Sequence, residues 1–270
     1  MRAMDPLWQS HIVLPGVGAI TERRLWSEGV HTLEDFVAAP RLRGISPQRK
    51  RDLNVEAQRA VAAHAGRDAR YFAQHLPHSE VWRMFARFAD EAAYLDIETS
   101  GLSRSAAITV VGVYRPAAGF TALVRGRGLS AANLTQALEG AKLLVTFNGA
   151  SFDLPFIRNQ MPSARLPPAH LDLLSVARRL DWRGGLKRIE QRLGLKRDLE
   201  TRVLAGADAV RLWRAWEKTG SENALRLLTR YNEHDCRNLE EVARAGAQAM
   251  VAALAMPPPS RRLQTTLAAA

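Results

Sequence analysis

Two carboxylates near position 97 are the first residues of this sequence that could do chemistry. Asp96 and Glu98 lie at the end of the apolar run 92–97. A run this short predicts a strand, and strand side chains two apart share a face. Two acids side by side on a buried strand repel each other, and burial raises their pKa values unless a positive group lies between them. Such oxygen ligands suit Mg²⁺ or Mn²⁺; the alternative is an acidic pair at a strand end that binds no metal.

Two further acidic elements follow along the chain. Asp153 comes shortly after the apolar run 143–147, so we expect it in a turn or first helical turn at the end of a strand, where site residues concentrate. Asp235 lies in a predicted helix over 222–249, four residues after Tyr231, which places both on one helical face. Taken alone, Asp153 could be a helix cap and Asp235 a solvated helix residue.

The elements that must position these acids read as an α/β pattern. Three β-rich runs predict an antiparallel meander, and helices and strands then alternate before helices take over from residue 175. We therefore expect a mixed sheet with flanking helices over residues 76–255. The predicted strands are 92–97, 108–114, 120–124, 143–147 and 170–174, and the predicted helices between them are 131–139 and 152–160.

The acidic elements together form an ordered series of motifs. Asp-x-Glu at 96–98, Asn-x3-Phe-Asp at 148–153 and Tyr-x3-Asp at 231–235 resemble the three exonuclease motifs of the DEDD (DnaQ-like) superfamily, in its Tyr-bearing branch. The run Asn-Gly-x-x-Phe-Asp-x-Pro-Phe and the element His-x-Asp-Leu-Leu from His170 are similar to the YprB-like group with a ribonuclease-H fold. The resemblance covers about residues 92–250.

The resemblance implies a two-metal 3′→5′ exonuclease with Mg²⁺ or Mn²⁺ as cofactor. It assigns Asp96, Glu98, Asp153 and Asp235 to the two ions, and Tyr231 to orientation of the attacking water. The resemblance also implies how the 3′-terminal nucleotide of the substrate is held. Thr99, Ser100 and Leu102 would contact it on one side, and Asn148 and Phe152 on the other.

Three neighbours of these motifs have open roles. Asp172 is interpreted as a hydrogen-bond partner and not as a ligand. His234 could replace the tyrosine, as in the family's His variant. Because it is the residue next to Asp235 on the helix, however, its side chain is expected to point away from the face of Asp235. The arginine-rich segment before the third motif departs from the family. It predicts either a basic rim near the metal site that contacts the phosphates of the nucleic-acid backbone, or a solvated amphipathic helix. Its basic residues are Arg178, Arg179, Arg183, Lys187, Arg188, Arg192, Lys196 and Arg197.

The N-terminal region has a different character. Pro15-Gly16-Val17-Gly18 predicts a tight turn that leads into a helix over 19–28, and Thr32 should cap the next helix. This resembles the helix-hairpin-helix module, whose backbone N–H groups bind a nucleic-acid phosphate. We expect a small all-α nucleic-acid-binding domain over 1–75 with a connector helix over 57–76; the alternative is a helical module that binds protein or only packs. Residues 256–270 are predicted to be disordered.

Composition agrees with a polyanionic partner. The 270 residues carry 38 Lys and Arg against 27 Asp and Glu, a net charge of +11, although an arginine-rich solvated surface would give the same balance. We expect nucleic acid, DNA in the first place and RNA as the alternative. The single cysteine excludes an internal disulfide and a cysteine-built zinc site. Neither a signal peptide nor a membrane-spanning run is present, so a cytoplasmic protein is expected.

Two other functions remain compatible with these observations. One is a non-catalytic nucleic-acid-binding protein on the same fold. The other is a structure-specific endonuclease.

Overall fold

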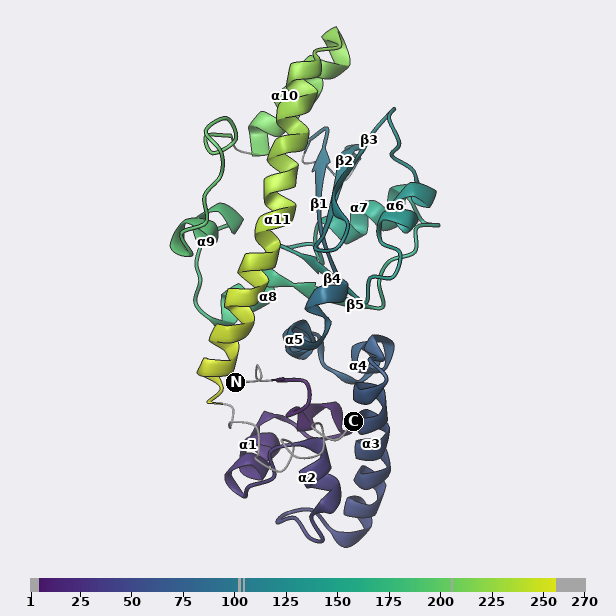
Figure 1. Ribbon diagram of the computed structural model, residues 1–270, viewed down its shortest axis with the longest axis vertical. Helices are drawn as coiled ribbons and strands as arrows, with labels where there is room; N and C mark the ends of the chain where they lie inside the picture. The colour runs from purple at the N-terminus through teal and green to yellow at the C-terminus, as the bar shows by residue number, and fades with distance from the viewer. Residues whose placement is uncertain (1–4, 102, 104, 205, 256–270) are drawn as a thin grey trace. The chain divides into compact units, whose positions relative to one another are not determined.

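The computed structural model describes residues 5–101, 103, 105–204 and 206–255 (Figure 1). The chain divides into two compact units, one made of Met1–Ala89 with Ala247–Ala270 and the other of Asp90–Gly246. The segment 256–270, for which disorder was predicted, lies outside the described residues.

The second unit is built on a five-stranded sheet with the strand order β3-β2-β1-β4-β5. β1 pairs antiparallel with β2 and β2 antiparallel with β3, which confirms the predicted meander. β4 lies parallel to β1, and β5 lies parallel to β4. The strands are β1 (Ala92–Thr99), β2 (Ile108–Arg115), β3 (Gly119–Val124), β4 (Leu143–Thr146) and β5 (Ala169–Asp172).

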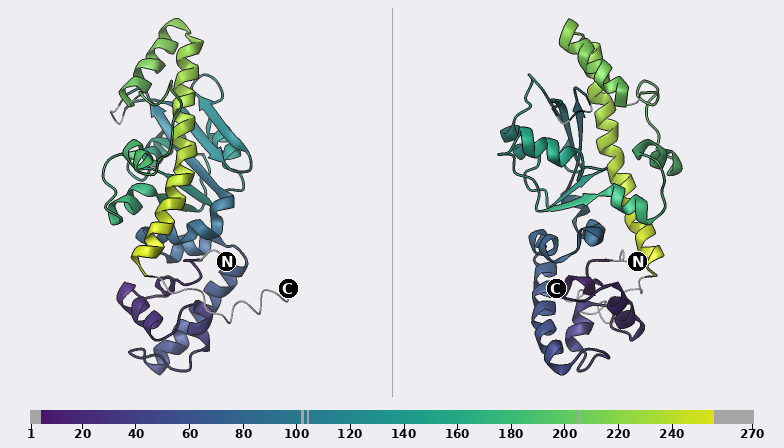
Figure 2. Two further views of the ribbon diagram at one scale, coloured as in Figure 1. Left: turned by 60° about the vertical axis from the view of Figure 1, so that its left-hand side comes forward. Right: turned by 180° about the vertical axis from the view of Figure 1, so that it is seen from behind.

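Helices cover both faces of this sheet, which confirms the predicted α/β class with a mixed sheet and flanking helices. α6 (Ala131–Ala137) and α7 (Asp153–Gln160) cover one face, and the long helix α11 (Glu222–Ala253) crosses the other (Figures 1 and 2). The remaining helices of the unit are α8 (Leu173–Arg179), α9 (Leu186–Arg192) and α10 (Gly206–Thr219).

The pleat of β1 decides which of its side chains meet which helices. Ala93, Leu95 and Ile97 belong to the hydrophobic core shared with α6 and α7. Because successive strand side chains point to opposite faces, Asp96 and Glu98 lie on the face of α11. A smaller core on that face joins the sheet to α10 and α11 through Val110, Trp213 and Leu228.

The first unit is helical, as predicted. Its elements are η1 (His11–Val13), α1 (Ala19–Ser27), α2 (Leu33–Ala38), α3 (Pro47–Ala65), α4 (Ala69–His75), η2 (His78–Met84) and α5 (Phe85–Phe88), with η3 (Ala89–Glu91) leading to β1. Thr32 and Asp35 form the capping box expected at the start of α2.

The single connector helix predicted over 57–76 is wrong. α3 already begins at Pro47, with Ser46 as its N-cap, and it ends before Gly66. Arg67 then adopts a positive φ of 51°, and Asp68 caps α4 by accepting a hydrogen bond from the Tyr71 N–H. A left-handed residue followed by a new cap ends one helix and starts another. The apolar residues keep a helical spacing across this break, so the sequence pattern predicted one helix.

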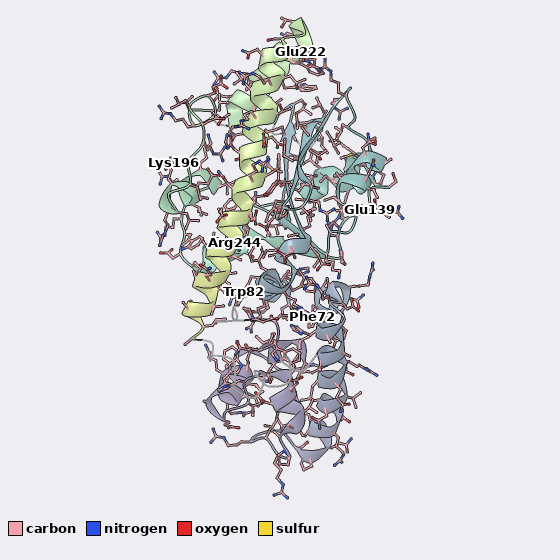
Figure 3. All side chains as sticks on the ribbon, in the orientation of Figure 1. Phe72, Trp82, Glu139, Lys196, Glu222 and Arg244 are labelled. Carbon is pink, nitrogen blue, oxygen red and sulfur yellow. The ribbon has the colours of Figure 1, made fainter. Side chains whose placement is uncertain are left out.

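A buried ion network holds the first unit together. The Arg83 side chain is 1% exposed and pairs with Glu22 and Glu80, each at 2.7 Å. Glu22 also accepts hydrogen bonds from the backbone N–H groups of His11 and Ile12. Glu22 therefore ties η1 to α1. Trp82, Phe85 and Phe88 are buried in this unit, as is Phe72 of α4; Figure 3 labels Trp82 and Phe72.

Candidate active site

Three carboxylates converge where β1 faces α11. One oxygen from each of Asp96, Glu98 and Asp235 lies within 4.8 Å of the others. Glu98 and Asp235 are 8% and 7% exposed, and Asp96 is partly buried. The strand pleat supplies two of these acids, and one turn of α11 supplies the third.

Asp153 reaches the same place from the first turn of α7. Its Oδ1 accepts a hydrogen bond from the backbone N–H of Ile97 at 3.1 Å. The pairing of β1 with β4 ends at Tyr94, so β1 runs on beyond its parallel neighbour. A strand N–H beyond the ladder needs another acceptor when it is buried. The Asp153 side chain fills that need, and this holds its carboxyl group beside the two acids of β1.

Asp172 at the end of β5 fixes the turn that carries Asp153. Its Oδ1 accepts from the N–H groups of Asn148 at 2.7 Å and Leu174 at 3.0 Å, and its Oδ2 accepts from that of Ala150 at 3.0 Å. The interpretation of Asp172 as a hydrogen-bond partner is therefore confirmed.

Asn232, the residue after Tyr231 in the third motif, is a residue of the site for which the sequence predicted no role. Its Nδ2 donates to Asp96 Oδ2 at 2.8 Å and to the backbone carbonyl of Asp96 at 3.2 Å. Gly112 lies opposite Asp96 on β2, and a Cβ there would come 1.9 Å from Asn232 Oδ1. Glycine at 112 is thus required for α11 to approach the sheet. The spacing of three residues to Asp235 was the available signal, since it puts Asn232 on the same helical face.

The cluster strongly disfavours its own ionisation. Burial, and then the neighbouring carboxylates, raise the pKa values of Asp96 and Glu98 well above their ordinary range. Burial also raises the pKa of Asp153 to about 7, against the hydrogen bonds that its carboxylate accepts from backbone N–H groups. The pKa of Asp235 is raised by burial and held down by Arg197. Burial and the same acids raise the pKa of Tyr231, so its phenol stays protonated.

A buried arginine completes the surroundings of Asp235. Arg197 precedes α10 in sequence, and its side chain is 4% exposed. Its Nη2 contacts Asp235 Oδ1 and, at 2.6 Å, Glu190 Oε1, while its Nε donates to Glu190 Oε2 at 2.7 Å. The sequence predicts a basic rim or a solvated helix for the segment of Arg197, and no role for Glu190. Neither periodicity nor charge count could have shown that this one arginine turns inward.

His234 has a different partner. Its Nε2 lies 2.9 Å from Asp198 Oδ2, in the segment that carries Arg197. The expectation that His234 faces away from the acids agrees with this contact.

The residues predicted to hold a 3′ terminus lie around the cluster in varied roles. Thr99 Oγ1 donates to the Gly101 carbonyl at 2.6 Å, and Ser100 Oγ accepts from the Ala107 N–H at 3.0 Å, next to a register shift between Glu98 and Thr99.

Phe152 packs against Phe156 and the core, with ring centroids 4.9 Å apart. Asn148 adopts a positive φ of 64° in the turn before α7. Leu102 lies outside the described residues.

Residues 93–245 match the family model described as the RNase H superfamily, a stretch that runs from β1 into α11 and covers more than half of the chain. The chain belongs to the RNase H superfamily. No curated protein and no solved structure matches it. The superfamily indicates a nuclease-type hydrolase that acts on nucleic acid.

None of the helices in the described part of the chain has the length and apolar character needed to cross a bilayer.

The donor set of this RNase H-like site fits divalent cations. All its groups are carboxylates, the ligands that Mg²⁺ and Mn²⁺ prefer. Glu98 Oε1 is buried and finds no hydrogen-bond partner among the described residues. A buried carboxylate oxygen without a partner is costly unless a cation neutralises it. Asp96, Glu98, Asp153 and Asp235 are the residues that could hold such ions.

The raised pKa of Asp153 predicts how pH acts on the stability of metal-free protein. Between the ordinary value of 3.8 and about 7, the folded state binds the Asp153 proton and the unfolded state releases it. This group therefore lowers the free energy of unfolding as pH rises through that window. Asp153→Asn should remove its share of the decline, and Mn²⁺ should stabilise wild type more at pH 8 than at pH 5.

Thermal unfolding of wild type and Asp153→Asn, each with EDTA and with Mn²⁺ from pH 5 to 8, measures both effects. Parallel pH profiles for the two proteins without metal would contradict the prediction.

Proposed function

We propose that the chain is a divalent-metal-dependent 3′→5′ exonuclease of the DEDD type, in its Tyr-bearing branch. The observation that carries the proposal is the convergence of Asp96, Glu98 and Asp235 beside Asp153, with Tyr231 one turn before Asp235 on α11. Three elements distant in sequence deliver these residues in the order of the family's motifs. Buried like charges in this number are costly without metal, which argues against a non-catalytic protein.

In this proposal the carboxylates hold two Mg²⁺ or Mn²⁺ ions. When bound, these ions would activate a water and stabilise the departing 3′ oxygen of the phosphodiester. Asn232 fixes the carboxylate of Asp96, and Asp172 fixes the turn that carries Asp153. Because its pKa is raised, Tyr231 would orient the water through a neutral hydroxyl and not remove its proton.

Dependence on a free 3′ end tests the proposal. A 5′-labelled oligonucleotide should be shortened from its 3′ end in Mg²⁺ or Mn²⁺, and a circular oligonucleotide or one with an inverted 3′-terminal nucleotide should stay intact. Matched DNA and RNA strands in the same assay decide the preferred substrate. Cleavage of the circle would favour a structure-specific endonuclease, and binding without cleavage would favour a non-catalytic protein.

We further propose that Pro15, Gly16, Val17 and Gly18 form a helix-hairpin-helix contact to a nucleic-acid phosphate. Gly16 has a positive φ of 67°, which turns the chain sharply into α1. Gly18 is the N-cap of α1 and offers no side chain to its first turn, so that turn can bind an anion. The Arg49 side chain donates to the Gly16 carbonyl at 3.1 Å, which adds positive charge beside the hairpin.

Gly18→Asp tests the hairpin without disturbing its fold. A Cβ at this position meets nothing within 4 Å, and aspartate is a favourable N-cap. The new carboxylate should occupy the anion site, weaken DNA binding by about tenfold and reduce the salt slope by about 1. Gly18→Asn, a neutral cap of the same shape, is the control and should bind more tightly than Gly18→Asp. Equal affinity of the two variants, measured by anisotropy at several salt concentrations, would contradict the proposal.

A further inference from the structure

The guanidinium of Arg197 occupies an unusual position for an arginine. It is nearly fully buried, it touches Asp235 of the acidic cluster, and it lies 5.4 Å from the centre of the Tyr231 ring. Its hydrogen bonds to described residues are made by Nε and Nη2. Nη1 is buried and has no partner within the described residues. A buried cationic donor that lacks an acceptor is costly, so this nitrogen suits an acceptor that arrives with a ligand.

Glu190 fixes the orientation of this guanidinium. The two hydrogen bonds to its carboxylate, at 2.7 Å and 2.6 Å, form the paired geometry that restrains an arginine fork in its plane. Glu190 is itself 2% exposed. The carboxylate of Glu190 neutralises the charge of Arg197. The carboxylate of Asp235 therefore remains available to a divalent ion while Arg197 stays in contact with it.

The segment that carries Arg197 is fastened to α11 at several points. Asp198 accepts a hydrogen bond from Arg230 at 2.9 Å and lies 2.9 Å from His234 Nε2. Glu200 pairs with Arg226 at 2.8 Å. Figure 3 labels Lys196, the preceding residue, in the segment that runs beside α11. These contacts hold Arg197 in place before any substrate binds, which is the condition under which a donor stabilises developing charge best.

We propose that Arg197 binds a non-bridging oxygen of the phosphate that is cleaved, through Nη1, while Glu190 and Asp235 hold the other nitrogens. The inference rests on the proposed function. Arginine suits this task because its planar donors match phosphate oxygens and its charge is permanent. Arg197 would then be a catalytic residue and Glu190 its positioning residue.

The test separates phosphate binding from metal binding and from turnover. If the 3′ oxygen departs, the phosphate stays on the 5′ carbon of the released nucleotide, so deoxyadenosine 5′-monophosphate is a probe of the site. Arg197→Lys should weaken its binding in Mn²⁺ by about tenfold or more, the worth of a charged hydrogen bond. Binding of deoxyadenosine and of Mn²⁺ alone should change less than about threefold. The turnover number on oligonucleotides should fall by about 10²-fold.

Arg244→Lys is the matched control, because Arg244 is an ion-paired arginine of α11 that is 49% exposed and lies outside the site. If Arg197→Lys does not fold, Glu190→Gln must still weaken binding of the monophosphate, since it releases the arginine fork.

Equal monophosphate binding and equal turnover of Arg197→Lys and Arg244→Lys would overturn the proposal. So would tighter Mn²⁺ binding with faster turnover at low metal, because Arg197 would then compete with the ion. Absence of any cleavage by wild type would instead remove the proposed function, and the binding comparison would still decide the role of Arg197.

Discussion

Asp153→Asn and Asp235→Asn should each lower hydrolysis of a 3′-ended oligonucleotide by about 10³-fold or more in Mg²⁺ or Mn²⁺. A metal ion contributes several kcal/mol to the transition state, and each substitution removes a charged ligand. Both variants should remain folded. In Asp153→Asn the new amide retains an oxygen that can accept from the Ile97 N–H, and its neutral side chain relieves the repulsion within the cluster. Single-turnover rates and thermal unfolding of the same preparations measure the two effects.

Asp181→Asn is the control for this pair. Asp181 is exposed, pairs only with Arg183 among the ion pairs of the described chain, and has a positive φ of 52° that asparagine also tolerates. Its variant should cleave at the wild-type rate. Undiminished hydrolysis by either site variant, or by wild type in excess EDTA, would refute the metal site.

Tyr231→Phe should lower turnover by about 10²-fold, at the lower end of the 10²–10⁴ range for one positioned side chain, with little change in substrate affinity. The substitution removes the hydroxyl and keeps the ring near Lys187 and Arg197, whose cationic groups lie 5.1 Å and 5.4 Å from its centre. Since the phenol of wild type stays protonated, the pH–rate profiles of both proteins should have the same shape.

His234→Ala measured beside it decides the competing assignment. The His234 side chain contacts Asp198, which follows Arg197 in the chain. Because His234→Ala removes this one hydrogen bond, we expect a loss of a few-fold at most, on the scale of about 1 kcal/mol. If the histidine variant collapses while the phenylalanine variant turns over at the wild-type rate, the Tyr-bearing branch is the wrong assignment.

The sequence by itself determined the antiparallel part of the sheet and the shared face of its two acids. The apolar runs of β1, β2 and β3 are short, β-rich and separated by turn residues, so local pattern sufficed to predict an antiparallel meander. The two-residue spacing of Asp96 and Glu98 then required a common face. The four-residue spacing of Tyr231 and Asp235 did the same on a helix. Such features depend on backbone periods of 2 and 3.6 residues, which are the same in every protein.

Only the tertiary structure decided what surrounds those acids. Asn232 reaches Asp96 across 136 residues, and this contact exists because Gly112 leaves room for it. Arg197 meets Asp235 across 38 residues and turns inward, although its neighbours in sequence form an ordinary basic run. The reason is physical: a charged side chain enters the interior only where partners compensate its lost hydration. Glu190 lies seven residues from Arg197, but Asp235 lies 38 residues away, and local sequence carries no record of that second contact.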